Sequence, residues 1–145
     1  MKRWRSYVSE AMLFLAWCAF VVLVFSNAGR AQEVQGIKCE ELKKIMDDKA
    51  DIVVVDNQPK EAYDIEHIKG AVNFPWTAEV RPPVNLPRDK TLVFYCACTH
   101  EEDSMDMANQ LMKKLGYRNI MVLEGGWLRW QELGYPSEGS DAEGK

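Results

Sequence analysis

The chain has 145 residues, which is room for one domain and a short additional segment. Its formal net charge is −4, and the first 31 residues hold four of the basic residues and one acidic residue, so the remainder carries −7. This acidic balance argues against binding to nucleic acid or to an anionic membrane surface.

The first 31 residues have the pattern of an export signal. A basic start at residues 2–5 precedes an unbroken apolar run at 11–25, and small residues follow at 26–28. This order is typical of a secretory signal peptide, although a retained membrane anchor stays open. The apolar run is shorter than the ~20 residues that span a bilayer, which favours the cleaved signal. In both cases we expect an exported domain, periplasmic or anchored outside the cytoplasm, that meets the membrane only through this segment.

Helix and strand patterns alternate along the following segment. Apolar residues at helical spacing predict a helix at 39–48, and a β-branched run predicts a buried strand at 52–55. A proline followed by helix formers predicts a helix at 59–65, and a short apolar stretch predicts a strand at 71–74. Residues 76–88 contain three prolines and are expected to form an irregular connection.

The alternation continues around two cysteines. A strand predicted at 91–95 ends at Cys96, which opens a polar loop that extends to residue 103. A helix is predicted at 104–115, where Gly116 stops it. The last predicted elements are a strand at 119–123, a helix at 127–133 and a disordered acidic tail at 137–145.

This order of elements predicts the fold class and one candidate site. Strands that alternate with helices indicate an α/β fold with a mostly parallel central sheet and helices on both faces. Ligands bind such sheets at the carboxyl ends of the strands. Cys96 stands at such an end, shortly before a helix. The pattern alone therefore marks Cys96 as a candidate site residue.

Four segments, in order, resemble the rhodanese-like domain family. They are IKCEELKKIMDD at 37–48, DIVVVDNQPKEAYDIEHIKGAVNFP at 51–75, LVFYC at 92–96 and LEGGWLRWQELGYP at 123–136. The resemblance covers residues 34–136 and implies the family's α/β fold. In the second segment it implies a hydrogen-bonded structural role for His67.

The resemblance also implies a sulfurtransferase. Cys96 would be the nucleophile that takes sulfane sulfur from a small donor, holds it as a persulfide and passes it to a thiol acceptor, either a small molecule or a protein. No cofactor and no metal are implied. A helix N-terminus with inward N–H groups would favour the thiolate and the persulfide anion. The active-site loop would consist of Ala97, Cys98, Thr99, His100, Glu101, Glu102 and Asp103.

This loop departs from the family's pattern in length and charge. It is longer than usual and contains no arginine, and Gln58 stands where an arginine is frequent. An arginine fork suits the thiosulfate dianion, so a neutral or thiol-bound donor is favoured here. The acidic residues at 101–103 are expected to turn outward and to stabilise the start of the next helix. A phosphatase is set aside because Arg118 is the first arginine after Cys96.

Cys98 leaves three interpretations open. It is a packed loop residue, or a second thiol that resolves a Cys96 persulfide or forms a transient disulfide, or a metal ligand with Cys96 and His100. Three soft ligands fall short of the four of structural zinc. After residue 31 the chain has three cysteines, Cys39, Cys96 and Cys98. Because this number is odd, at least one free or reactive thiol is expected. The functions that remain are a sulfurtransferase, a non-enzymatic binding or thiol-redox module that uses Cys96 and Cys98, and a metal-handling protein.

Overall fold

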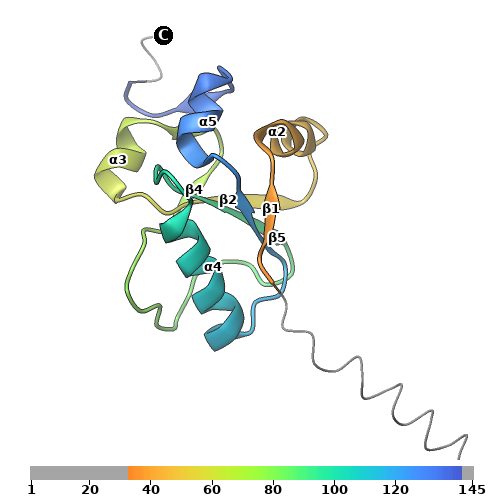
Figure 1. Ribbon diagram of the computed structural model, residues 1–145, viewed down its shortest axis with the longest axis vertical. Coiled ribbons are helices and arrows are strands. Elements are labelled where there is room, and N and C mark those ends of the chain that lie inside the picture. Colours follow the sequence, from red (N-terminus) through yellow and green to blue (C-terminus); the bar gives the residue numbers. More distant parts are fainter. Residues whose placement is uncertain (1–32, 142–145) are drawn as a thin grey trace, which may run out of the picture. The chain divides into compact units, whose positions relative to one another are not determined.

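The computed structural model describes residues 33–141, which form a parallel sheet with helices on both faces (Figure 1). In spatial order the sheet contains β1 (Gln35–Ile37), β6 (Ile120–Leu123), β5 (Thr91–Tyr95), β2 (Ile52–Asp56) and β4 (Val72–Asn73). The helices are α2 (Cys39–Asp47), α3 (Lys60–Ile65), α4 (Glu102–Leu115) and α5 (Gly126–Glu132). A separate antiparallel pair consists of β3 (His67–Ile68) and β7 (Ser137–Glu138). The predicted fold class is confirmed.

The central strands bury both of their faces. Because successive strand residues point to opposite sides, neighbours in β5 belong to different cores. Val93 packs in a core with Leu42 of α2 and Trp130 of α5. Phe94 packs on the opposite face with Leu111 of α4. Figure 1 shows α2 and α5 on one side of the sheet and α4 on the other. This double burial is why the strands read as continuous apolar runs.

Helix α4 follows its predicted apolar stripe but begins at Glu102, two residues before the predicted start. Glu101 adopts a left-handed backbone conformation at φ 55°, and its carbonyl accepts the Met105 N–H at 2.8 Å. Gly116, at φ 71°, ends the helix as predicted. The loop after Cys96 is therefore shorter than the sequence suggested, because Glu102 and Asp103 belong to the first turn of α4.

The predicted disordered tail is wrong for its first residues. Ser137 and Glu138 form β7, which pairs with β3. The Glu138 carboxylate accepts the Gly70 N–H at 2.9 Å, and the Ser137 hydroxyl donates to Glu66 at 2.7 Å. Polar partners from a distant segment thus order this strand. Residues 142–145 lie outside the described range.

The predicted export signal at 1–31 also lies outside the described residues. None of the helices at 33–141 combines the length and apolar character that a membrane crossing requires. The export prediction therefore remains a prediction from sequence.

Candidate active site

Cys96 follows β5 directly, at the carboxyl end of a strand that lies between β6 and β2. The residue is 1% exposed. Its carbonyl accepts the Trp127 N–H from α5 at 2.9 Å. A Cβ added at Gly126 would collide with that same carbonyl oxygen. The glycine is therefore required because the start of α5 packs against the backbone of Cys96.

The sulfur of Cys96 lies among polar groups from the loop and from α4. The Cys98 N–H is directed at it from 3.4 Å. The hydroxyl of Ser104, a buried residue in the first turn of α4, lies 3.5 Å from the same sulfur. Cys96 and Cys98 are joined by a disulfide bond. A sulfur anion released from that bond would lie at the N-terminus of a 14-residue helix, whose dipole favours negative charge.

The three loop acids have different surroundings. The half-buried Glu101 turns toward the loop after β6, and its carboxylate accepts the Gly125 N–H at 2.6 Å. Glu102 is exposed, and hydrogen bonds from its own backbone N–H and that of His100 lower the pKa of its carboxyl. Asp103 is half-buried in the first turn of α4. The outward orientation is confirmed for Glu102, whereas the Glu101 carboxylate instead joins the loop after Cys96 to the loop after β6 through the Gly125 N–H.

The other predicted loop residues lie at the surface. Ala97 and Thr99 are exposed, and Cys98 is half-buried. The side chain of His100 is 80% exposed, and its Nδ1 lies 3.5 Å from the Glu102 carboxylate. The described residues contain no group of three or more potential metal ligands of the His, Cys, Asp or Glu type. The structure thus brings Cys98 to Cys96 and leaves His100 with Glu102.

A buried polar pair that the sequence did not reveal supports the end of β5. The hydroxyl of Tyr95 donates to the Asp56 carboxylate at 2.5 Å and accepts the Ile68 N–H at 3.0 Å. Burial raises the pKa of the Asp56 carboxyl, and hydrogen bonds from Tyr95 and Gln58 oppose this rise. Burial also raises the pKa of Tyr95. Because Tyr95 directly precedes Cys96, this pair fixes the strand end that carries Cys96.

Gln58 does not replace the arginine that is frequent at its position. Its side-chain amide donates to Asp56 at 3.1 Å, and its backbone N–H donates to the same carboxylate at 2.7 Å. The residue is 9% exposed. Its backbone N–H and its side-chain amide thus both donate to Asp56 inside the fold.

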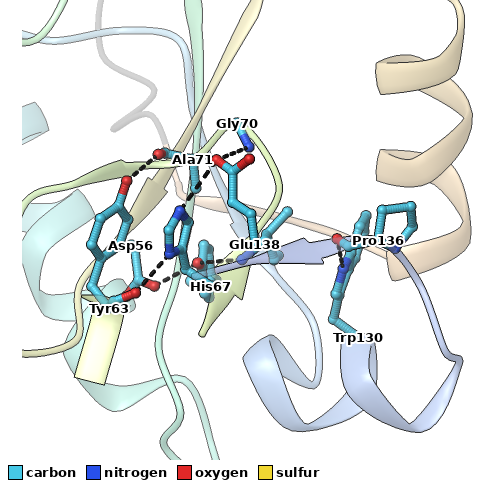
Figure 2. A network of polar contacts seen from close by, with 10 residues as sticks. Asp56, Tyr63, His67, Gly70, Ala71, Trp130, Pro136 and Glu138 are labelled. Carbon is cyan, nitrogen blue, oxygen red and sulfur yellow. Dashed lines mark hydrogen bonds and ion pairs between the residues drawn. The ribbon is translucent and has the colours of Figure 1, made fainter. Parts of the chain in front are cut away.

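His67 has the hydrogen-bonded structural role that was expected (Figure 2). Its Nδ1 lies 2.6 Å from the Tyr63 carbonyl oxygen, to which it donates a hydrogen bond. Its Nε2 lies 3.3 Å from the Glu138 carboxylate. The ring stacks on that of Tyr63 at 3.7 Å between centroids. Figure 2 shows this cluster where β3 and β7 meet.

These features define a parallel α/β domain that presents a cysteine at the carboxyl edge of its sheet, beside a helix N-terminus. The chain belongs to the rhodanese-like domain family, whose model matches residues 38–133. The predicted family is confirmed.

Solved structures agree with this fold. The BH2092 protein from Bacillus halodurans superposes with a TM-score of 0.67 at 21% identity, over 87% of this chain and 85% of that one. A rhodanese-related protein from Thermoplasma volcanium gives a TM-score of 0.58 at 27% identity, over 72% and 97% of the two chains.

A curated relative is named for sulfur transfer. The adenylyltransferase and sulfurtransferase UBA4 of Meyerozyma guilliermondii is 29% identical over 87 residues. The match covers 56% of this chain and 20% of that protein. The chain thus spans about a fifth of the relative's length.

Proposed function

We propose that this chain is a sulfurtransferase in which Cys96 takes a sulfane sulfur from a donor and carries it as a persulfide. The observation that carries the proposal is the position of the Cys96 sulfur where α4 begins. The Cys98 N–H is directed at this sulfur, and the Ser104 hydroxyl, which also reaches the Glu101 carbonyl at 3.1 Å, lies 3.5 Å from it. Membership of the rhodanese-like family and the sulfurtransferase name of a relative support it.

The proposed reaction consists of two exchanges. The Cys96 thiolate attacks the outer sulfur of a donor persulfide, the new sulfur–sulfur bond forms, and the donor leaves as a thiol. A thiol acceptor then attacks the outer sulfur and restores Cys96. Each exchange replaces one sulfur–sulfur bond with another, so no electrons are gained or lost overall. The loop N–H, the Ser104 hydroxyl and the α4 dipole stabilise the anionic sulfur between the two exchanges.

The charges around the site favour a thiol persulfide over thiosulfate as the donor. Residues 96–103 contain three acidic residues and no lysine or arginine. Glu102 keeps its negative charge because hydrogen bonds lower the pKa of its carboxyl. A dianion would meet this charge without an arginine to bind it. We further propose that the reaction takes place outside the cytoplasm, on the basis of the signal-like residues 1–31.

The test follows the leaving group of the donor. The reduced full-length chain, kept in mild detergent, is mixed with a thiol persulfide, and released thiol is counted. We expect one equivalent per chain from wild type and only background from Cys96→Ser, which retains Cys18, Cys39 and Cys98. Cys39→Ala should match wild type, because burial raises the pKa of this thiol to about 11. Equal release by Cys96→Ser would overturn the proposal.

A thiol-redox module remains a second candidate because Cys96 and Cys98 form a disulfide. A pair with only this role would be oxidised equally well by a disulfide that contains no sulfane sulfur. Comparing oxidised glutathione with a thiol persulfide, at equal concentration, separates the two functions. A sulfurtransferase reacts faster with the persulfide.

A further inference from the structure

We propose that Cys98 resolves the Cys96 persulfide, so that the chain releases the carried sulfur as hydrogen sulfide and is left with the Cys96–Cys98 disulfide. This inference rests on the proposed persulfide at Cys96. It adds a second catalytic thiol and a product, and it makes the chain a reductant of sulfane sulfur as well as a carrier.

The first argument is reach. Cys96 and Cys98 are bonded in the structure, with their Cα atoms 5.4 Å apart, inside the usual range for a disulfide. The Cys98 backbone N–H also points at the Cys96 sulfur from 3.4 Å. The backbone of the loop therefore already has the conformation that the product requires.

The second argument is access. Cys96 is 1% exposed, and only one residue separates it from the half-buried Cys98. An acceptor thiol must reach the persulfide by diffusion from solution, whereas Cys98 is held beside the Cys96 sulfur. A thiol of the same chain has an effective concentration far above that of a dissolved thiol. Cys98 is therefore the first nucleophile that a Cys96 persulfide meets.

The step is balanced in atoms and electrons. The Cys98 thiolate attacks the inner sulfur, Sγ of Cys96, and the bond between this sulfur and the outer sulfur breaks. The outer sulfur leaves as HS⁻ with both bonding electrons and takes up the proton that Cys98 lost. The two thiols are oxidised by two electrons, and the sulfane sulfur is reduced to sulfide. An external dithiol reductant, or two equivalents of a small thiol, then restores the two cysteines.

The charge of the loop suits this product. Glu101 and Glu102 flank the start of α4, and the Glu102 carboxyl stays ionised because hydrogen bonds lower its pKa. Negative charge at the rim opposes retention of HS⁻. Cys39 is no rival for the role, because its buried sulfur donates to the Glu124 carbonyl at 3.5 Å.

The experiment uses the reduced full-length chain, freed of added thiol and given one equivalent of a thiol persulfide. Wild type should release one equivalent of sulfide, and its mass should fall by two hydrogens relative to the reduced chain. Cys98→Ser should gain one sulfur and release sulfide roughly 100-fold more slowly. Cys98→Ala should behave like Cys98→Ser, and Cys39→Ala like wild type.

The outcomes separate this inference from the proposed function. If wild type keeps the added sulfur and releases sulfide no faster than Cys98→Ser, the resolving role is overturned while the carrier function stands. If Cys98→Ser gains no sulfur and wild type releases no sulfide, the proposed function itself fails. Sulfide release that persists in both Cys98 variants would also overturn the resolving role.

Discussion

Replacing Gly126 with alanine tests whether the start of α5 positions Cys96. Gly126 has φ 49°, and an added Cβ would meet the Cys96 carbonyl oxygen, a backbone atom that cannot rotate away. The neighbouring Trp127 N–H donates to that oxygen at 2.9 Å. Gly134 is a matched control, since it has φ 65° and nothing within 4 Å of an added Cβ.

Both substitutions place alanine in a left-handed backbone conformation, but only Gly126→Ala also creates a collision with the backbone of Cys96. Alanine in the left-handed region costs about 1 kcal/mol at either position. At Gly126 the new contact must also push the helix away from Cys96 and weaken the Trp127 hydrogen bond, which adds about 1 kcal/mol. We expect Gly126→Ala to lower the free energy of unfolding by about 2 kcal/mol, against about 1 kcal/mol for Gly134→Ala.

Urea unfolding of the reduced chains measures these differences, and the persulfide assay measures the reactivity of Cys96. Gly126→Ala should slow thiol release from the donor, whereas Gly134→Ala should leave it unchanged. Equal destabilisation by the two variants would refute the proposed contact. An unchanged rate in a destabilised Gly126→Ala would refute the positioning role of α5.

Substitutions at three further residues test the contacts that support the site. Tyr95→Phe removes one of the donors to the Asp56 carboxylate, which keeps those of Gln58, and leaves the buried Ile68 N–H without its acceptor, so urea unfolding should show a loss of about 2 kcal/mol; a negligible loss would contradict it. Burial raises the pKa of the Asp56 carboxyl in the folded state above 3.8. The protonated carboxyl therefore stabilises the folded state fully below pH 3.8, and this stabilisation is lost as the pH rises through the raised pKa. As the pH rises from 3.8 through the raised pKa, Asp56→Asn should therefore gain stability relative to wild type. A difference in the free energy of unfolding that does not change with pH would refute the raised pKa of Asp56. Glu101→Ala removes the acceptor of the Gly125 N–H and should cost about 1 kcal/mol, while Glu101→Gly should cost less because it relieves the φ of 55°; the reverse order would contradict this.

The sequence predicts the central elements well because local pattern and burial agree there. The strand at 91–95 has the predicted bounds, and α4 follows its predicted stripe to residue 115. The pairing of β3 with β7 gave no such signal, because each strand has two residues and depends on the carboxylate of Glu138. A strand that is ordered by one distant side chain shows no alternation of apolar and polar residues from which it could be predicted.

The same contrast applies to the site. Cys96 could be located because it ends a buried strand in an α/β pattern, where ligand sites form. The contact of Glu101 with Gly125 joins residues that are 24 positions apart, and the bond of Tyr95 to Asp56 spans 39. The polar ends of two apolar strands, Asp56 and Tyr95, were the available signal for that pair.

The most direct test of the central claim locates the sulfur itself. Reduced Cys98→Ser is treated with a thiol persulfide and cleaved after Lys90 and Lys113, which gives one peptide that contains position 96. Mass-spectrometric fragmentation of that peptide assigns the added mass. The proposed function predicts one extra sulfur on Cys96, absent from the Cys96→Ser/Cys98→Ser double variant. A peptide without added sulfur, or sulfur found on another cysteine, would contradict it.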